Sequence, residues 1–465
     1  MALSMGTNGV RGLLAQLGPN EAMRLGFGFA KWRMGQSPPK DAAAYRIAIA
    51  RDMRLTSPML MQAACSGVMA AGCEALDIGL LPSPLAEWAA TKYDADGLII
   101  VTASHNPPEW NALKFVDGNG VAVSRERGEK ICAFQQNSLP PLPWQKIGRL
   151  GKIDGIIETY ISHAASFASD LHGSNPGKGL SVIFDPGNGT STLAAPKLLE
   201  KLGAKVKVIN GTLDGTFPSR PSEPTEKNVA GLIKAVLAEA ADFGVACDGD
   251  SDRVVFVDDK GRWLVGDKGV AIHAINALAK TGKNKPSPAV ITTVATSRVV
   301  EDVVSANGGS IQYVKVGAPY ISEAMLEHNA VFGGEEVGGI IYPGFSLAKD
   351  GILAAAMLLG MAKEKPISKW HDALPKYFNA KTKIECAPAK KQTAMSSLAT
   401  SLPASSPSAK PNLADGIRLD FPDAWVIIRA SGTENYFRIF AEAKSQEKAE
   451  SLMNKFAAIV KDALN

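Results

Sequence analysis

Cysteine is scarce in this chain of 465 residues, with five in all, and no two of them form a Cys-x-x-Cys pair. An odd and scattered set excludes a disulfide framework and indicates a reducing, cytoplasmic compartment. No apolar run approaches the ~18 residues that a membrane span needs, and the segment 1–6 lacks the basic and apolar regions of an export signal. We therefore expect neither export nor membrane insertion.

Blocks of like charge are also absent, and the net charge of +4 with a pI near 8.6 is only mildly basic. Basic residues are not interleaved with aromatic ones as on nucleic-acid-binding surfaces. A hydrophobic content of 46% with 21% charged residues is typical of a globular protein. We expect no nucleic-acid partner, whereas anionic small molecules suit this charge.

The length predicts about three or four domains. Apolar, β-branched runs alternate with helical patterns three times, and each block ends in a loop rich in Gly and Asp, which is typical of repeated α/β units. Beyond about residue 365, short strands precede a closing helix, which predicts a smaller α+β domain. The expected domains are 1–150, 151–255, 256–368 and 369–465.

Individual elements follow from the same patterns. The predicted strands are 45–50, 97–101, 180–184, 289–293, 417–421 and 425–428, and the predicted helices are 58–72, 192–202 and 446–464. The Ser-, Ala- and Pro-rich segment 396–411 is either a poor helix with a loop or a flexible segment. The composition changes near residues 365–376, and we expect a hinge there.

Ser104 lies where an apolar strand gives way to a turn, between the run 97–101 and Asn106-Pro107. We expect its hydroxyl to stand exposed at the strand end, where α/β sheets build ligand sites. Turn formation alone would also account for Ser-His-Asn-Pro, so the remaining motifs decide between the two interpretations.

Three aspartates stand at alternate positions in the segment 248–253, which reads Asp-Gly-Asp-Ser-Asp-Arg and follows the apolar stretch 243–246. In an extended loop this spacing points the carboxylates to one side, and oxygen ligands favour Mg²⁺ or Ca²⁺. An EF-hand would need Gly at Arg253 and Glu at Asp259. A solvated acidic turn is the simpler alternative. The pattern predicts a Mg²⁺ site to which phosphorylated Ser104 could add an oxygen.

Three further loops present groups that bind phosphates or sugars. The segment 429–435, Arg-Ala-Ser-Gly-Thr-Glu-Asn, together with Arg438 offers guanidinium, hydroxyl and backbone N–H donors to a phosphate. The loop 334–339 brings a carboxylate close to a ligand, where it can accept hydrogen bonds from vicinal sugar hydroxyls. The loop 6–12 presents Arg11 between glycines. Each loop taken alone also fits an ordinary surface turn.

Together, in this order, these segments resemble the α-D-phosphohexomutases, the family of phosphoglucomutase, phosphomannomutase and phosphoglucosamine mutase. The resemblance covers essentially the whole chain. The segment 102–107, followed by Asn111-Ala112-Leu113-Lys114, resembles the phosphoserine loop of the family, and 248–253 resembles its metal loop. Glu335 lies in what looks like the sugar loop, and 429–433 in the phosphate loop. The Glu-Glu-Val-Gly-Gly sequence of the sugar loop looks closest to the archaeal-type branch.

The resemblance implies four domains around a central cleft, with Ser104 phosphorylated in the resting enzyme. The phosphoryl group would pass to O6 of a hexose 1-phosphate, and Ser104 would recover the phosphoryl group of O1 from the 1,6-bisphosphate, which also serves as activator. Mg²⁺ would be held by Ser104, Asp248, Asp250 and Asp252. The implied substrates are glucose, mannose or glucosamine phosphates, and the implied assembly is a monomer or homodimer.

The implied roles divide the remaining residues between catalysis and binding. Lys114 and His105 are both candidates for moving the sugar proton, and His105 fits a loop-fixing role equally well. To act as a base, Lys114 would need a lowered pKa, and the positive charges clustered around it are a reason to expect one. Arg11 and Arg253 would neutralise the transferring phosphoryl group. The expected substrate-binding residues are Arg253, Lys315, Glu335, Arg429, Ser431, Gly432, Thr433 and Arg438.

Some residues depart from the family pattern. Val337 stands where many members have Ser or Asn, Gly339 where bacterial members often have His, and Asn8 where Asp or Ser is usual. A sugar bisphosphate synthase or phosphatase, and a non-catalytic sugar-phosphate-binding regulator, remain as alternatives. The preferred hexose is not determined by the sequence.

Overall fold

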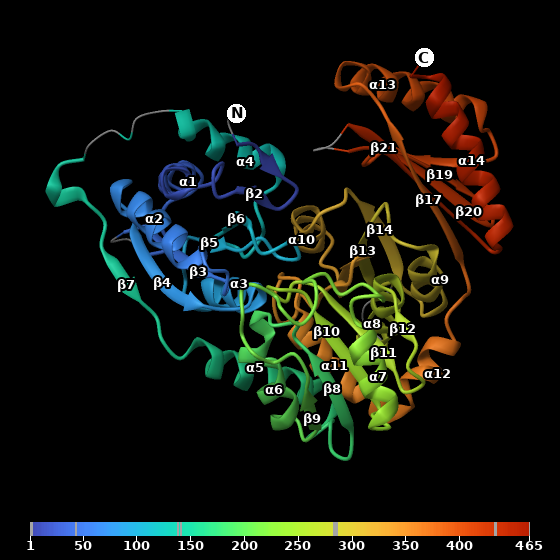
Figure 1. Ribbon diagram of the computed structural model, residues 1–465, viewed down its shortest axis with the longest axis horizontal. Coiled ribbons are helices and arrows are strands. Elements are labelled where there is room, and N and C mark those ends of the chain that lie inside the picture. Colours follow the sequence, from blue (N-terminus) through green and yellow to red (C-terminus); the bar gives the residue numbers. More distant parts are fainter. Residues whose placement is uncertain are drawn as a thin grey trace.

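The computed structural model describes residues 3–41, 44–136, 139, 142–281, 287–431 and 435–464. Within these residues, four sheets with their helices follow one another along the chain and lie in an arc, with the first (blue) and the fourth (red) at its ends (Figure 1). We call them units one to four in chain order. The predicted architecture, three α/β units and a smaller C-terminal unit, is confirmed.

Unit one contains a mixed seven-stranded sheet in the order β1-β2-β6-β5-β3-β4-β7. Its strands are β1 Met5–Gly6, β2 Gly9–Leu13, β3 Arg46–Arg51, β4 Glu74–Leu80, β5 Gly97–Val101, β6 Trp110–Asp117 and β7 Leu150–Lys152. Its helices are α1 Pro19–Met34, α2 Ser57–Ala70, α3 Ser83–Lys92 and α4 Arg125–Cys132. Along β5, Ile99 and Val101 join the cluster under α1 and α2, whereas Leu98 and Ile100 join the cluster under α3. An unbroken apolar run is therefore needed, because both faces are covered.

Unit two has the strand order β12-β11-β10-β8-β9. Its strands are β8 Ser181–Asp185, β9 Lys205–Val208, β10 Phe243–Cys247, β11 Val254–Asp258 and β12 Trp263–Leu264, and its helices are α5 Ile156–His172, α6 Ala195–Lys201 and α7 Ala230–Ala238. The predicted helix 192–202 is shorter than expected, because a 3-10 turn at Thr190–Leu193 precedes α6. The sheet continues to Leu264, past the expected boundary at residue 255, which falls inside β11.

Unit three has the strand order β14-β13-β15-β16. Its strands are β13 Ala289–Thr293, β14 Ser310–Val314, β15 Phe332–Glu335 and β16 Gly339–Ile341. Its helices are α8 Gly266–Lys280, α9 Arg298–Ala306, α10 Ala318–Glu327, α11 Gly351–Glu364 and α12 Ile367–Asp372. The expected boundary at residue 368 falls inside α12.

The first three units repeat one strand arrangement. In each, two neighbouring strands run parallel and the second continues into an antiparallel partner: β3, β5 and β6; β8, β10 and β11; β13, β15 and β16. The carboxyl end of the second parallel strand, with the loop after it, carries Ser104 in unit one, the three aspartates in unit two and the Glu-Glu pair in unit three. The fold therefore places three of the motifs at equivalent strand ends.

Unit four is an antiparallel sheet, β17-β21-β20-β19-β18, packed against two helices. Its elements are β17 Phe378–Glu385, α13 Pro388–Ser405, β18 Lys410–Asn412, β19 Ile417–Phe421, β20 Ala424–Ala430, β21 Tyr436–Ala443 and α14 Gln446–Asp462. Most of the uncertain segment 396–411 is thus the end of α13, which buries Leu398 and Leu402 in the core of the unit.

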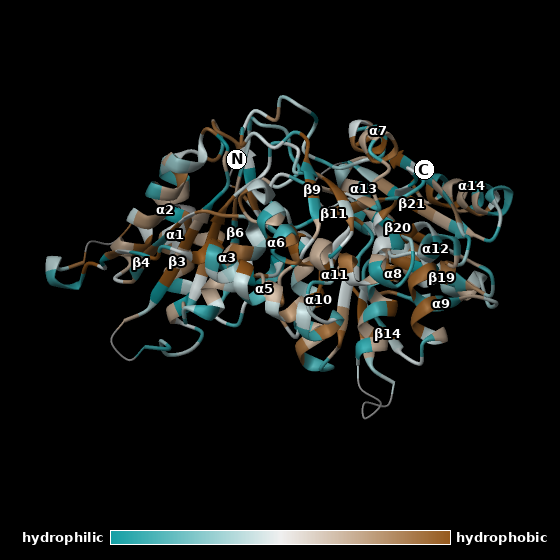
Figure 2. Cartoon of the chain, turned by 90° about the horizontal axis from the view of Figure 1, so that it is seen from below, coloured by the Kyte–Doolittle hydropathy of each residue, from teal (hydrophilic) through white to brown (hydrophobic). Residues whose placement is uncertain are grey.

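One hydrophobic cluster extends through units one to three, whereas unit four has a cluster of its own. Figure 2 shows the hydrophobic residues in brown along the interior strands and hydrophilic residues in teal on outer helices such as α14. The stretch in which we expected a hinge is partly anchored, because Ser368 of α12 donates two hydrogen bonds to Asp259 and Asp372 pairs with Arg262. Between α12 and β17, Leu374 is buried in the large hydrophobic cluster and Tyr377 donates a hydrogen bond to Asp302, so the expected hinge stays a prediction.

Candidate active site

Ser104 follows the end of β5, as predicted, but its side chain is buried rather than exposed. The aspartate loop of unit two covers it, and Ser104 Oγ donates a hydrogen bond of 2.6 Å to Asp248 Oδ2. Asp252 Oδ1 lies 3.5 Å from the same oxygen. The backbone of Ser104 has a φ of 51°, in the left-handed region that non-glycine residues rarely adopt. The expected exposure was wrong because contacts between units cannot be seen in a local pattern.

Asp248, Asp250 and Asp252 are all buried and each offers a carboxylate oxygen within 4.8 Å of the others. Burial, followed by the charges of Asp250 and Asp252, raises the pKa of Asp248, because three anions share one site. Asp250 Oδ1 is buried and has no hydrogen-bond partner. An orphaned oxygen in a hard, all-oxygen donor set fits a divalent cation such as Mg²⁺.

Lys114, on β6, donates hydrogen bonds of 2.6 Å to Asp250 Oδ2 and 2.9 Å to Asp252 Oδ2. Burial alone would lower the pKa of Lys114, but the two carboxylates outweigh it and hold the pKa above its usual value. The expected lowering is therefore wrong in this arrangement, because the nearest groups are anions and not the cations of the cluster.

His105 and Arg11 flank the serine. His105 Nδ1 lies 3.4 Å from Ser104 Oγ, and Arg11 donates a hydrogen bond of 2.9 Å to Asn106 Oδ1 of the same loop. Burial, helped by the charges of Arg253 and Arg11, lowers the pKa of His105 to about 3. His105 is therefore neutral and too weakly basic to take a proton efficiently near pH 7.

Glu335 is joined to the aspartate loop by Lys349, a residue that the sequence analysis missed. Lys349 Nζ lies 2.8 Å from Glu335 Oε1 and 3.4 Å from Asp252 Oδ2, and all three side chains are buried. Arg253, whose Nε is buried without a hydrogen-bond partner, pairs with Glu223 at 3.3 Å. Gly339 packs directly beside Lys349, so that a Cβ at this position would overlap Lys349 Cδ.

Lys315 lies at the edge of unit three and pairs with Glu126 of unit one. Its Nζ is 3.4 Å from Glu126 Oε1, in an ion pair of which both side chains are largely exposed. Tyr320 donates a hydrogen bond to the same carboxylate, at 2.9 Å. Lys315 therefore bridges units one and three and makes no described contact with the aspartates.

Arg429 and Arg438 are paired residues on the neighbouring strands β20 and β21 of unit four, so their side chains share one face. Arg429 donates a hydrogen bond of 2.6 Å to Asp415, and its Nε is buried without a partner. Ser431 is buried directly after β20. Gly432 and Thr433 lie outside the described residues. Two like charges on one sheet face favour an anion between them.

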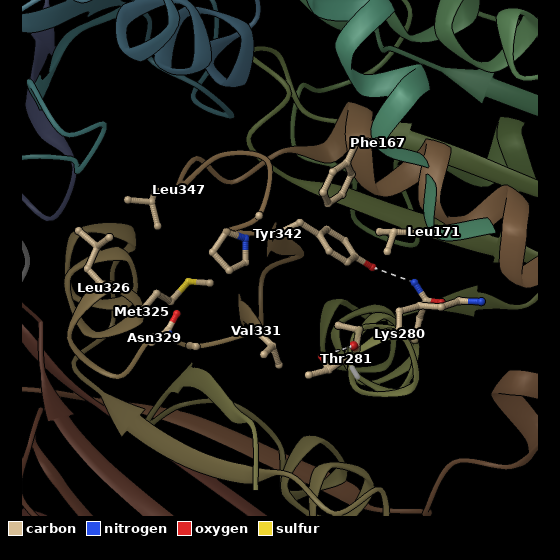
Figure 3. Close-up of a pocket in the computed structure, with 15 residues that line it drawn as sticks. Phe167, Leu171, Lys280, Thr281, Met325, Leu326, Asn329, Val331, Tyr342 and Leu347 are labelled. Carbon is tan, nitrogen blue, oxygen red and sulfur yellow. Dashed lines mark hydrogen bonds between the residues drawn. The ribbon is translucent and has the colours of Figure 1, made fainter. Parts of the chain in front are cut away.

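A cavity among the described residues lies away from these loops, between α5 of unit two and the helices α8 and α10 of unit three. It has a volume of about 560 Å³ and is lined mainly by apolar side chains, among them Phe167, Met325 and Val331 (Figure 3). Tyr342 accepts a hydrogen bond from Asn276 at its edge. A phosphate needs several cationic groups, and Lys280 alone among the lining residues carries a positive charge, so this cavity does not fit a sugar phosphate.

Among the described residues, no helix is long and apolar enough to cross a membrane.

Family models describe each part of the chain. The four models for domains I, II, III and the C-terminal domain of phosphoglucomutase/phosphomannomutase match residues 2–139, 158–261, 265–378 and 382–459, respectively. A phosphoglucomutase/phosphomannomutase of Thermococcus kodakarensis is 38% identical, and the match covers 100% of both chains. A probable phosphoglucosamine mutase of Pyrococcus abyssi is 35% identical over 100% of this chain and 99% of the relative.

Solved structures give the same fold. A phosphoglucomutase/phosphomannomutase family protein from Burkholderia thailandensis superimposes with a TM-score of 0.84 at 23% identity, covering 99% of this chain and 97% of its own. N-acetylphosphoglucosamine mutase of Aspergillus fumigatus, solved in complex with GlcNAc-6P and magnesium, gives a TM-score of 0.60 at 15% identity, covering 100% and 96%.

Proposed function

The chain belongs to the phosphoglucomutase/phosphomannomutase family, and we propose that it interconverts hexose 1-phosphates and hexose 6-phosphates through phosphorylated Ser104. As a member of this family it is an intramolecular phosphotransferase. The observation that carries the proposal is the hydrogen bond of 2.6 Å between Ser104 Oγ and Asp248 Oδ2, within a buried triad of carboxylates.

The proposed reaction has two transfers. In the first, the bond between phosphorus and Ser104 Oγ breaks while a bond forms to O6 of the hexose 1-phosphate; the O6 hydroxyl loses its proton and Ser104 Oγ gains one. In the second, the 1,6-bisphosphate has turned around, and the bond between phosphorus and O1 breaks while a bond forms to Ser104 Oγ; the serine hydroxyl loses its proton and O1 gains one. The product is the hexose 6-phosphate, and Ser104 is phosphorylated again.

The surrounding residues have distinct proposed roles. Mg²⁺ held by the three aspartates and Ser104 would neutralise charge on the transferring phosphoryl group. Arg11 and Arg253 add positive charge at the same place. Lys114, held as a cation by Asp250 and Asp252, is suited to donating a hydrogen bond and supplying positive charge rather than to accepting or releasing a proton. His105, neutral and close to Oγ, is suited to orienting the serine.

Substrate recognition is assigned to units three and four. Glu335, fixed by Lys349, would accept hydrogen bonds from sugar hydroxyls present in both orientations of the ligand. Lys315 would contact the sugar or its phosphate after leaving Glu126. Arg429, Ser431 and Arg438, with Gly432 and Thr433 of the same segment, would hold the phosphate that is not being transferred.

The identity of the hexose is best tested with a panel. The names of the relatives support glucose, mannose and glucosamine phosphates as candidates. We propose hexose 1,6-bisphosphate as the activator, because it can phosphorylate Ser104. We further propose a cytoplasmic location, to which the five free cysteines are suited, and a monomer or homodimer without nucleic-acid or membrane partners.

The test is mutase turnover with Mg²⁺ and a 1,6-bisphosphate primer, comparing glucose, mannose and glucosamine 1-phosphates for the wild type and Ser104→Ala. We expect Ser104-dependent formation of hexose 6-phosphate and phosphorylation of Ser104 by mass spectrometry. Release of inorganic phosphate would indicate a phosphatase, and accumulation of the bisphosphate a synthase. Binding of these sugar phosphates without turnover by folded, phosphorylated wild type would indicate a regulator and contradict the proposal.

A further inference from the structure

Arg54 is one of the largest fully buried side chains of the protein, although it lies in the loop that follows β3. A buried cation is costly unless its donors are satisfied. The roles assigned above do not use this one, so its contacts need an explanation of their own.

The guanidinium of Arg54 donates hydrogen bonds to the backbone of the phosphoserine loop. One terminal nitrogen, Nη2, donates to the carbonyl oxygens of Ser104 (2.9 Å) and Asn106 (2.7 Å). The other, Nη1, donates to those of Pro107 (2.6 Å) and Trp110 (3.3 Å). Four carbonyl oxygens between residues 104 and 110 therefore converge on one side chain.

Asp52 holds the guanidinium in place from the opposite side. Arg54 Nε donates to Asp52 Oδ2 at 3.1 Å, while Asp52 Oδ1 accepts from the backbone N–H of Arg54 and from Ser57 Oγ. The ring of Phe217, from unit two, lies 5.0 Å from the guanidinium carbon. All five N–H donors of the fork are thus used, an arrangement that the single ammonium of a lysine cannot reproduce.

The loop needs such a support for two reasons. Ser104 has a left-handed backbone, which costs free energy in any residue with a Cβ and persists only where the surroundings impose it. Its carbonyl oxygen accepts hydrogen bonds from Arg54 and from Ser222 Oγ, at 3.3 Å. Carbonyl oxygens are also the negative ends of peptide dipoles, and their engagement by Arg54 leaves them unavailable to oppose a phosphoserine dianion.

We propose that Arg54 is a positioning residue for phosphoryl transfer, which holds the carbonyl oxygens of the loop 104–110 so that Ser104 Oγ meets the aspartate triad. The inference rests on the proposed role of Ser104 as phosphoryl carrier. It assigns Arg54 to the geometry of the transfer and not to the binding of sugar or phosphate.

The test compares Arg54→Lys with Arg33→Lys. Arg33 is a matched control, because it is also a buried arginine of unit one and donates to the carbonyl oxygen of Asp96, at the opposite end of β5 from Ser104. Single-turnover transfer from phosphorylated Ser104 to the hexose 1-phosphate is measured by rapid quench, together with kcat, KM and the melting temperature. The wild type must first show that Ser104 is phosphorylated and that this phosphoryl group turns over. If it does not, the result contradicts the proposed function and not the role of Arg54.

For Arg54→Lys we expect the transfer rate and kcat to fall about 100-fold, the loss that a displacement of ~1 Å produces, with KM changed by less than about threefold. Arg33→Lys should keep the transfer rate within about twofold of the wild type. A transfer rate in Arg54→Lys reduced no more than in Arg33→Lys, or a raised KM with unchanged transfer, would overturn the proposal.

A second variant covers the case in which Arg54→Lys does not fold. Asp52→Asn keeps the shape of the partner but removes its charge, so the guanidinium is held less firmly. We expect a transfer rate about tenfold lower, again with KM within about threefold. An unchanged transfer rate in folded Asp52→Asn would count against the proposal.

Discussion

Ser104 and Asp248 are separated by 144 positions in the chain, and their side chains are joined by a hydrogen bond of 2.6 Å. Each lies in the loop after the second parallel strand of its unit, so the contact forms only when units one and two dock. Asp248 is one of the three carboxylates that fit Mg²⁺, and Ser104 contacts both Asp248 and Asp252 of this group. Ser104 and its acidic partners therefore form one site and not two adjoining ones.

Asp248→Asn should weaken Mg²⁺ binding at least tenfold and lower kcat by two orders of magnitude or more, because it removes one of three charges that a hard cation needs. Titration of turnover against Mg²⁺, with calorimetry of binding, measures both effects. Asp258→Asn provides a control, since Asp258 is equally buried but lies at the far end of β11. Equal Mg²⁺ dependence in wild type and Asp248→Asn would rule out this site.

Lys349→Met should reduce stability by about 3 kcal/mol, because Glu335 and Asp252 would lose the buried cation between them. We also expect a KM for hexose 1-phosphate raised by about tenfold, since Glu335 would no longer be held in place. Denaturant unfolding and steady-state kinetics check the two effects. Lys363→Met removes an exposed lysine and should change neither; an unchanged KM in Lys349→Met would show that Glu335 does not need this partner.

Glu126→Gln should lower KM, because Lys315 would no longer have to leave an ion pair before it meets a substrate. Exposed ion pairs are worth at most about 1 kcal/mol, so the decrease should be less than about fivefold and should shrink as salt is added. Kinetics at low and high ionic strength measure this. A raised KM would mean that Glu126 itself assists binding.

Stability should fall as the pH drops below about 6.5, partly through His273 and His172. Burial lowers the pKa of His273 to about 3, and burial with the nearby charge of Lys280 lowers that of His172 to about 4. Both remain neutral in the folded chain while the unfolded chain takes up protons, and each such group costs ~1.4 kcal/mol per pH unit.

The pH dependence is tested by comparing His273→Gln with the wild type, using urea unfolding at several pH values between about 7.5 and 4.5. The variant lacks one of the two groups, so its free energy of unfolding should fall less steeply with decreasing pH. Parallel curves for variant and wild type would show that His273 titrates normally in the folded protein.

The local sequence pattern was sufficient for elements whose environment is uniform along their length. Strand β5 is apolar throughout because both faces are covered, and α14 carries a clear apolar stripe next to its polar face. Segment 396–411 was ambiguous because small and polar residues dominate it, and its helical end depends on the sheet that buries Leu398 and Leu402. Packing between elements therefore decided what propensity alone left open.

The sequence predicted the motifs of the candidate site, but it did not predict the residues that hold those motifs in place. Glu335 lies in a distinctive glycine-bounded loop, whereas Lys349 follows it by 14 positions in a segment with no recognisable pattern. Arg54 resembles any arginine of a polar loop until the carbonyl oxygens around it are known. The pKa of Lys114 was misjudged for the same reason, because its nearest charges belong to another unit.

Gly339 lies against the side chain of Lys349, so closely that a Cβ on the glycine would overlap the lysine. A larger residue at 339, such as the histidine frequent in bacterial members, is therefore incompatible with this lysine in its present position. The two positions should be exchanged together rather than one at a time when this chain is given the sugar loop of another family member. A larger side chain at 339 alone should therefore lower the stability of the protein, because Lys349 would have to leave its contacts with Glu335 and Asp252.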